Sequence, residues 1–83
     1  MTAQLTCPSP EREDVCRRLH RVRPSVFRPV PRDAICTREY GGPQTARIRG
    51  TIGRRRVDAR FNRSGGCEIA RYDAVRFLLD LAR

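Results

Sequence analysis

The stretch ARIRGTIGRRRVDARF, residues 46–61, decides the fold of this 83-residue chain. In its two halves, residues 46–52 and 57–61, small or apolar residues alternate with polar ones. This alternation, with Gly53-Arg54 as a turn signal between the halves, predicts a β-hairpin. One apolar and one polar face is typical of an antiparallel sheet that buries a single face. We therefore expect the apolar face to need a covering layer.

The sequence also contains a candidate helix upstream of the hairpin. Pro10 suits the first position of a helix, and Pro24 cannot continue one, so the two prolines bound it. Between them, Val15, Leu19 and Val22 recur at helical spacing. The sequence therefore predicts one amphipathic helix that ends before Pro24.

The segment between this helix and the hairpin is irregular. Residues 23–34 contain three prolines, which exclude a regular helix or strand. Val26, Phe27 and Val30 are the apolar residues that could hold the segment against the core. We expect an extended loop.

The C-terminal segment supports two interpretations. Residues 67–69 read as extended structure after the loop at 62–66. Residues 72–83 have the composition of a helix, yet the alternation around Arg76 also fits a strand. Periodicity in so short a segment does not decide between them.

The four cysteines compensate for a small core. A chain of 83 residues forms one domain, spanning residues 1–83, and buries only about 60% of its unfolded surface. Four cysteines in such a chain predict two disulfides, with three pairings open. None of the cysteines forms a C-x-x-C pair, and the single histidine, His20, lies four positions after Cys16, so the sequence argues against a zinc or other metal site.

Disulfides predict an oxidising compartment. Residues 1–5 lack the apolar stretch of a secretory signal, and no run is long enough to cross a membrane. We expect a secreted, extracellular protein whose signal peptide is not part of this chain, with no membrane partner.

The net charge is +9, and all 18 basic residues are arginines. A basic surface attracts phosphate or other polyanions, so a polyanion-binding or nucleic-acid-binding module is the alternative function. The arginines are spread along the chain, however, and aromatic residues for base stacking are scarce, which argues against nucleic acid. The run at residues 54–56 is interpreted as the solvated tip of the hairpin.

The sequence offers no catalytic constellation. It lacks a Ser/His/Asp set around His20, paired carboxylates and a glycine-rich phosphate loop. We therefore expect neither an enzyme nor a cofactor.

Short segments in a particular order and spacing carry the strongest functional signal. They are Leu5-Thr6-Cys7, Cys16-Arg17-Arg18-Leu19, Ile35-Cys36-Thr37-Arg38-Glu39-Tyr40, Pro43, Gly50, the Gly53 to Val57 turn, Phe61 and Cys67-Glu68. Together, from about residue 4 to about residue 78, the chain resembles the Streptomyces subtilisin inhibitor family of serine-protease inhibitors.

The resemblance implies a disulfide pairing and a fold. The pairs are Cys7 with Cys16 and Cys36 with Cys67. The fold is α+β: a small antiparallel β-sheet with one main α-helix packed on one face and two disulfides, in which residues 74–78 form a strand. The family usually begins with one more strand before the segment that corresponds to Leu5-Thr6-Cys7, and since only six residues precede Cys7 here, we expect that edge strand to be missing. The family also commonly dimerises through its sheet, so a homodimer is one implied state.

The resemblance also implies a reactive bond. In the family this bond lies two residues after the third cysteine, which here is the bond between Arg38 and Glu39. The protease-binding loop is then Ile35-Cys36-Thr37-Arg38-Glu39-Tyr40, with Arg38 as the primary specificity residue for a trypsin-like serine protease and, as a second target, a subtilisin-like one. The family supports this loop with an asparagine shortly before the last cysteine. Here Asn62 stands further upstream, and residues 63–66 separate it from Cys67.

Overall fold

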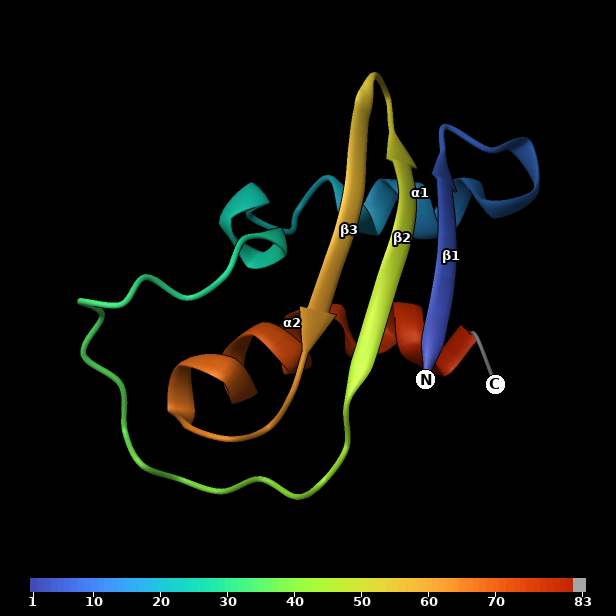
Figure 1. The fold of residues 1–83 in the computed structure, drawn as a ribbon. Helices are drawn as coiled ribbons and strands as arrows, with labels where there is room; N and C mark the ends of the chain where they lie inside the picture. Colours follow the sequence, from blue (N-terminus) through green and yellow to red (C-terminus); the bar gives the residue numbers. More distant parts are fainter. Residues whose placement is uncertain (82–83) are drawn as a thin grey trace.

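The computed structural model describes residues 1–81 and shows a small α+β fold (Figure 1). A three-stranded sheet lies in front of two α-helices, and two disulfides are present, which confirms the expected fold class. In chain order the elements are β1 (Thr2–Cys7), the 3₁₀ turn η1 (Pro10–Arg12), α1 (Glu13–Leu19), the 3₁₀ turn η2 (Pro24–Phe27), β2 (Ala46–Ile52), β3 (Arg55–Phe61) and α2 (Gly66–Leu81).

The sheet has the strand order β1-β2-β3. The β2–β3 hairpin is antiparallel, as predicted, and pairs Ala46 with Phe61 at its open end. β1 instead runs parallel to β2, with Ala3 opposite Ile48, so the sheet is mixed and the expectation of a wholly antiparallel sheet is wrong for this pair. Parallel neighbours need a long crossover connection, and residues 8–45, with α1 inside them, provide it.

One face of the sheet forms the core. Alternate residues of the hairpin, such as Ile48 and Phe61, are buried, while the residues between them face solvent. Both helices pack on this buried face and leave the other face open (Figure 1). The buried core residues are Ala3, Leu5, Cys7, Val15, Cys16, Leu19, Ala46, Ile48, Val57, Ala59, Phe61, Tyr72, Val75, Leu78 and Leu79.

The main helix is α2, not the segment upstream of the hairpin. Residues 67–69 and 74–78, expected as extended structure and as a strand, both belong to α2, so these expectations are wrong. Tyr72, Val75 and Leu79 are buried at spacings of three and four residues, and this helical stripe packs on the sheet. The strand-like alternation at residues 75–77 is too short to compete with a buried stripe that runs from Tyr72 to Leu79, about two helical turns. Residues 82–83, the end of the ambiguous segment, lie outside the described part.

The upstream helix is short but placed as expected. It is divided into η1 and α1, and α1 ends at Leu19, with Pro24 opening η2. The proline-rich segment is held against the core, because the Phe27 ring meets the Phe61 ring edge-on at a centroid distance of 6.4 Å. Val26 and Val30 are half-buried beside it.

The open face of the sheet carries one well-defined ion pair. The Arg47 guanidinium donates two hydrogen bonds of 2.8 Å to the Asp58 carboxylate on the neighbouring strand. These bonds hold the pKa of Asp58 below its ordinary value of 3.8, with the positive charges of Arg49 and Arg60 acting in the same direction. Asp58 therefore stays ionised to a lower pH in the folded chain than in the unfolded chain.

Phe61→Ala tests which face of β3 forms the core. The Phe61 side chain is 1% exposed, so truncation leaves a cavity, and we expect a loss of about 3–5 kcal/mol in the free energy of unfolding. The neighbouring Arg60→Ala, on the solvent face, is the control and should change it by less than about 0.5 kcal/mol. Urea denaturation with the disulfides intact measures both. Equal losses would contradict the register.

Asp58→Asn tests the ion pair through pH. A depressed carboxyl pKa stabilises the fold above pH 3.8, and this contribution is lost as the pH falls through the lower pKa of the folded state. Asp58→Asn should therefore lower the melting temperature at about pH 6, and this difference should shrink toward about pH 2 as Asp58 becomes protonated in the folded state as well. Thermal unfolding followed by circular dichroism measures the difference. A gap of the same size at both pH values would refute the ion-pair explanation.

Candidate reactive-site loop

The segment that contains Arg38 lies outside the packed layers. It follows η2 and sweeps around the sheet before it enters β2 (Figure 1). Every residue from 31 to 40 is exposed. The Ile35 side chain is 100% exposed and that of Tyr40 is 71% exposed, although both are large and apolar. All six predicted loop residues are thus available to a partner.

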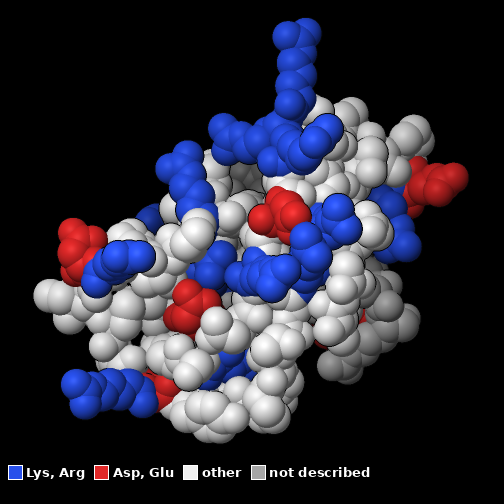
Figure 2. All heavy atoms as spheres, in the orientation of Figure 1, with Lys and Arg blue, Asp and Glu red and all other residues white. Residues whose placement is uncertain are grey.

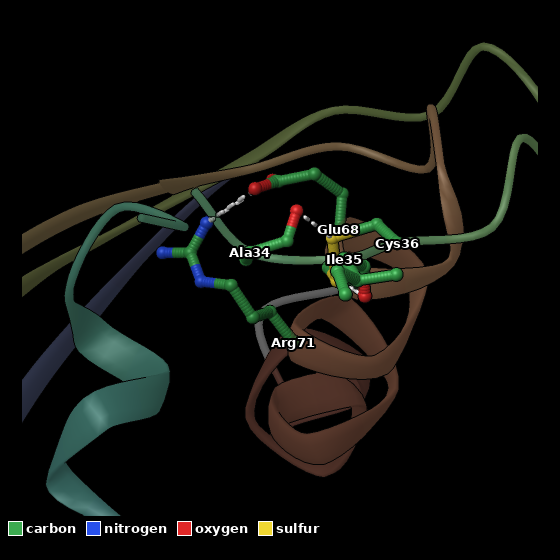
Figure 3. The surroundings of a disulfide bond; sticks show 6 residues. Ala34, Ile35, Cys36, Glu68 and Arg71 are labelled. Atoms are coloured by element: carbon green, nitrogen blue, oxygen red, sulfur yellow. Dashed lines mark hydrogen bonds and ion pairs between the residues drawn. A yellow bond between two sulfur atoms is a disulfide. The ribbon is translucent and has the colours of Figure 1, made fainter. Parts of the chain in front are cut away.

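The two disulfides have the pairing that the resemblance implied. Cys7, at the end of β1, is bonded to Cys16 in α1, with the Cα atoms 5.7 Å apart. Cys36, in the loop, is bonded to Cys67 in the first turn of α2, with the Cα atoms 5.4 Å apart. Figure 3 shows this second bridge directly beneath Ile35. It fastens the loop to the helix two residues before Arg38.

The carbonyl groups on both sides of Arg38 are held by backbone amides. The Gly66 N–H donates to the Thr37 carbonyl at 2.9 Å, and the Gly65 N–H donates to the Glu39 carbonyl at 2.7 Å. Arg38 lies between these two anchor points, with an exposed side chain and no ion pair in the described residues. The loop is therefore held by its backbone on both sides of Arg38, while the Arg38 side chain is exposed.

Arg63 holds the end of the loop. The Gly41 N–H donates to the Arg63 carbonyl at 2.7 Å, and the Arg63 Nε donates back to the Gly41 carbonyl at 2.9 Å. The Arg63 side chain is 13% exposed, is paired with Asp73 at 2.7 Å, and lies 4.9 Å from the centre of the Tyr72 ring. Sequence analysis did not identify this residue, because nothing in the sequence distinguishes it from the other arginines.

The hydrogen bonds of the Asn62 side chain within residues 1–81 go to the turn before α2 and to α2 itself, not to the loop. Its Oδ1 accepts a hydrogen bond from the Ser64 amide at 2.9 Å, and its Nδ2 donates to Glu68 at 3.1 Å. Glu68 in turn pairs with Arg71 (Figure 3), whose Nε donates to the Val26 carbonyl at 2.9 Å. Asn62 thus shapes the turn before α2, and backbone amides take over the direct support of the loop.

Two glycines make the close approach possible. Gly65 has a φ of +99°, in the left-handed region that favours glycine. A Cβ atom at Gly66 would overlap the Thr37 hydroxyl oxygen. A side chain at either position would therefore strain the backbone or displace the Thr37 side chain.

The cysteines offer no other chemistry. All four form disulfides, so none is available as a nucleophilic thiolate or as a metal ligand. Residues 1–81 contain no group of histidine, cysteine and carboxylate side chains that could hold a metal ion. Within the same residues, no helix is long and apolar enough to cross a membrane.

Comparisons with protein-family models, with curated proteins and with solved structures find no match for this chain.

The contact between Gly66 and Thr37 predicts a conditional effect. Alanine usually favours a helix over glycine, yet Gly66→Ala should lower the free energy of unfolding by about 1–3 kcal/mol, because its Cβ collides with the Thr37 hydroxyl. Thr37→Ala removes that hydroxyl, so the double variant should regain most of the loss. Thermal unfolding and hydrogen exchange of the residue 65 and residue 66 amides measure both effects.

Thr37→Ala alone is the matched control and should leave both amides protected. A stable Gly66→Ala, or a double variant no better than the single one, would show that the loop does not lie against these glycines.

Proposed function

We propose that this chain is a small secreted inhibitor of serine proteases that presents the Arg38–Glu39 bond to a trypsin-like enzyme. The observation that carries the proposal is that the carbonyls of Thr37 and Glu39, on either side of Arg38, are both held by backbone amides. A protease binds the backbone of its substrate and one specificity side chain, and both are accessible in this loop. The function needs no cofactor and no catalytic residue in the chain itself.

Rigidity separates an inhibitor from a substrate. Ordering the backbone of a flexible segment costs about 1–2 kcal/mol per residue. In this loop, the disulfide at Cys36 and the hydrogen bonds from Gly65 and Gly66 already order the backbone when the protein folds. Docking to a protease therefore loses little further entropy, which raises affinity.

The Arg38 side chain has the right chemistry for a trypsin-like pocket. A guanidinium forms charge-assisted, bidentate hydrogen bonds with a carboxylate, and a carboxylate lies at the base of that pocket. The side chain is exposed and makes no ion pair in residues 1–81, so it needs no release from a partner before it binds.

The anchors on both sides of the bond also favour religation. If the protease cleaves the Arg38–Glu39 bond, Arg38 acylates its serine, and this new end stays tied through Thr37 to Gly66 and through Cys36 to the disulfide. The released amine at Glu39 stays tied to Gly65, and Tyr40 pairs with Ser64. The amine remains beside the acyl carbon at high effective concentration and competes with water.

The exposed apolar residues of the loop add contact area. Three large hydrophobic side chains are exposed in the described part of the chain, namely Met1, Ile35 and Tyr40, and two of them flank Arg38. The two disulfides suit an oxidising, extracellular environment, where such an inhibitor meets secreted proteases.

Titration of trypsin with the disulfide-intact protein tests the proposal. We expect stoichiometric inhibition, and Arg38→Ala should weaken it by at least about 30-fold, since truncation of a buried anchor typically costs about 2 kcal/mol or more. Arg32→Ala removes an exposed arginine from the same connection, outside the predicted loop, and should inhibit like the unmodified protein.

Mass spectrometry of the same mixtures locates any cleavage. Rapid and complete hydrolysis after Arg38, without inhibition, would show that the loop is a substrate. Inhibition that survives Arg38→Ala would place the reactive bond elsewhere.

A further inference from the structure

The open face of the sheet gathers basic side chains. The residues of β2 and β3 that point away from the core include four arginines, and Figure 2 shows basic groups spread over these strands and the hairpin that joins them. The four are Arg47, Arg49, Arg56 and Arg60. We call them, together with the strand residues around them, the arginine face. Neither helix covers it.

The arginine face contains one acidic residue, Asp58. Asp58 is paired with Arg47 at 2.8 Å and lies 3.9 Å from Arg49. Arg56 and Arg60 form no ion pair in residues 1–81. Most of the positive charge on this face is therefore not neutralised by the chain itself.

The neighbouring side chains are polar and uncharged. Thr2, Gln4 and Thr6 of β1 are exposed on the same face, as is Thr51 of β2. The exposed large hydrophobic side chains, Met1, Ile35 and Tyr40, all lie outside the three strands. The arginine face thus combines rows of guanidinium groups with hydroxyl and amide groups on a flat support.

The side chains of the arginine face fit some anionic partners better than others. Single-stranded nucleic acid is usually held by aromatic side chains on which bases stack, and the arginine face has none. A membrane surface usually takes up apolar side chains, which are also missing here. A second copy of the chain would bring like charges together. Hydroxyl and amide groups beside cations instead suit a sugar polymer that carries acidic groups.

We propose that the arginine face binds an acidic polysaccharide of the extracellular space. Alternate residues of a strand lie about 6.6 Å apart and neighbouring strands about 4.8 Å apart, so the guanidinium groups form a regular array. Each guanidinium can bind a sulfate or carboxylate with two hydrogen bonds. Thr2, Gln4 and Thr6 exchange hydrogen bonds with sugar hydroxyls along β1.

This surface is separate from the reactive-site loop. The loop is fastened to Cys67 and to Gly65 and Gly66, before and at the start of α2, whereas the arginine face is the uncovered side of the sheet. One molecule can therefore hold a polysaccharide and a protease at the same time, and loss of one activity does not entail loss of the other.

Calorimetric titration with a heparin dodecasaccharide at low salt tests the proposal. The variant Arg49→Gln/Arg56→Gln/Arg60→Gln should bind at least about tenfold more weakly, as the loss of three exposed ionic contacts predicts. The control Arg21→Gln/Arg23→Gln/Arg76→Gln removes the same charge from exposed positions on the helical side and should bind within about twofold of the unmodified protein.

A variant that should bind heparin more tightly provides a second, independent test. Asp58→Asn removes the single carboxylate of the arginine face, and it should tighten heparin binding about two- to five-fold. Thermal unfolding and trypsin inhibition of each variant show whether it is folded. Neither measurement should change for Arg49→Gln/Arg56→Gln/Arg60→Gln.

Three results would overturn the proposal: no heparin binding at low salt, equal weakening by the two triple variants, or a charge-matched DNA duplex or anionic vesicle binding as tightly as heparin through the same arginines.

Discussion

The bond between Cys36 and Cys67 is the constraint on which the rest of this molecule depends. It ties a connection that forms no helix or strand after η2 to the first turn of α2. In the chain-entropy model, a bridge that closes a loop of this length stabilises the fold by about 3.7 kcal/mol, and small domains have about 5–15 kcal/mol in total. With the two segments held together, the loop carbonyls meet the amides of Gly65 and Gly66. These hydrogen bonds, on both sides of Arg38, fix where Arg38 lies.

The start of α2 suits this role because a helix begins with free amides. The first N–H groups of any helix have no partner within it. Gly65 is the residue whose carbonyl accepts the first helical hydrogen bond, from Ile69 at 2.9 Å, so its own N–H and that of Gly66 point outward. In this chain they are satisfied by the loop. A helix start, in place of the extended structure that the sequence predicted at residues 67–69, therefore provides backbone donors that contact the loop directly, and Asn62 shapes the turn behind them.

The arginines divide into groups with different physical roles. Some complete the core, because a guanidinium can lie flat on an aromatic ring while its outer edge remains solvated. Others, Arg56 and Arg60, lie on the open face of the sheet and form no ion pair within residues 1–81, and Arg38 projects from the proposed reactive-site loop. A lysine would not replace the first group, since its compact ammonium lacks the planar stacking surface. The stacked pairs are Arg18 on Phe77, Arg63 on Tyr72 and Arg71 on Phe61, at 4.4, 4.9 and 4.8 Å.

The amino-acid pattern alone was enough to predict the hairpin at residues 46–61, its buried face and the need for disulfides. Alternation is a local property that a strand turns directly into two faces, and the cysteine content follows from the small core. The resemblance supplied the cysteine pairing and the exposed segment around Arg38. Only the tertiary structure decided that β1 runs parallel to β2 and that residues 74–78 are helical. Strand direction depends on the path of the crossover, and the helix of α2 depends on the sheet that its stripe packs against. The support of the loop by Arg63, Gly65 and Gly66 was likewise decided in three dimensions, since those contacts join residues more than 20 positions apart in the chain.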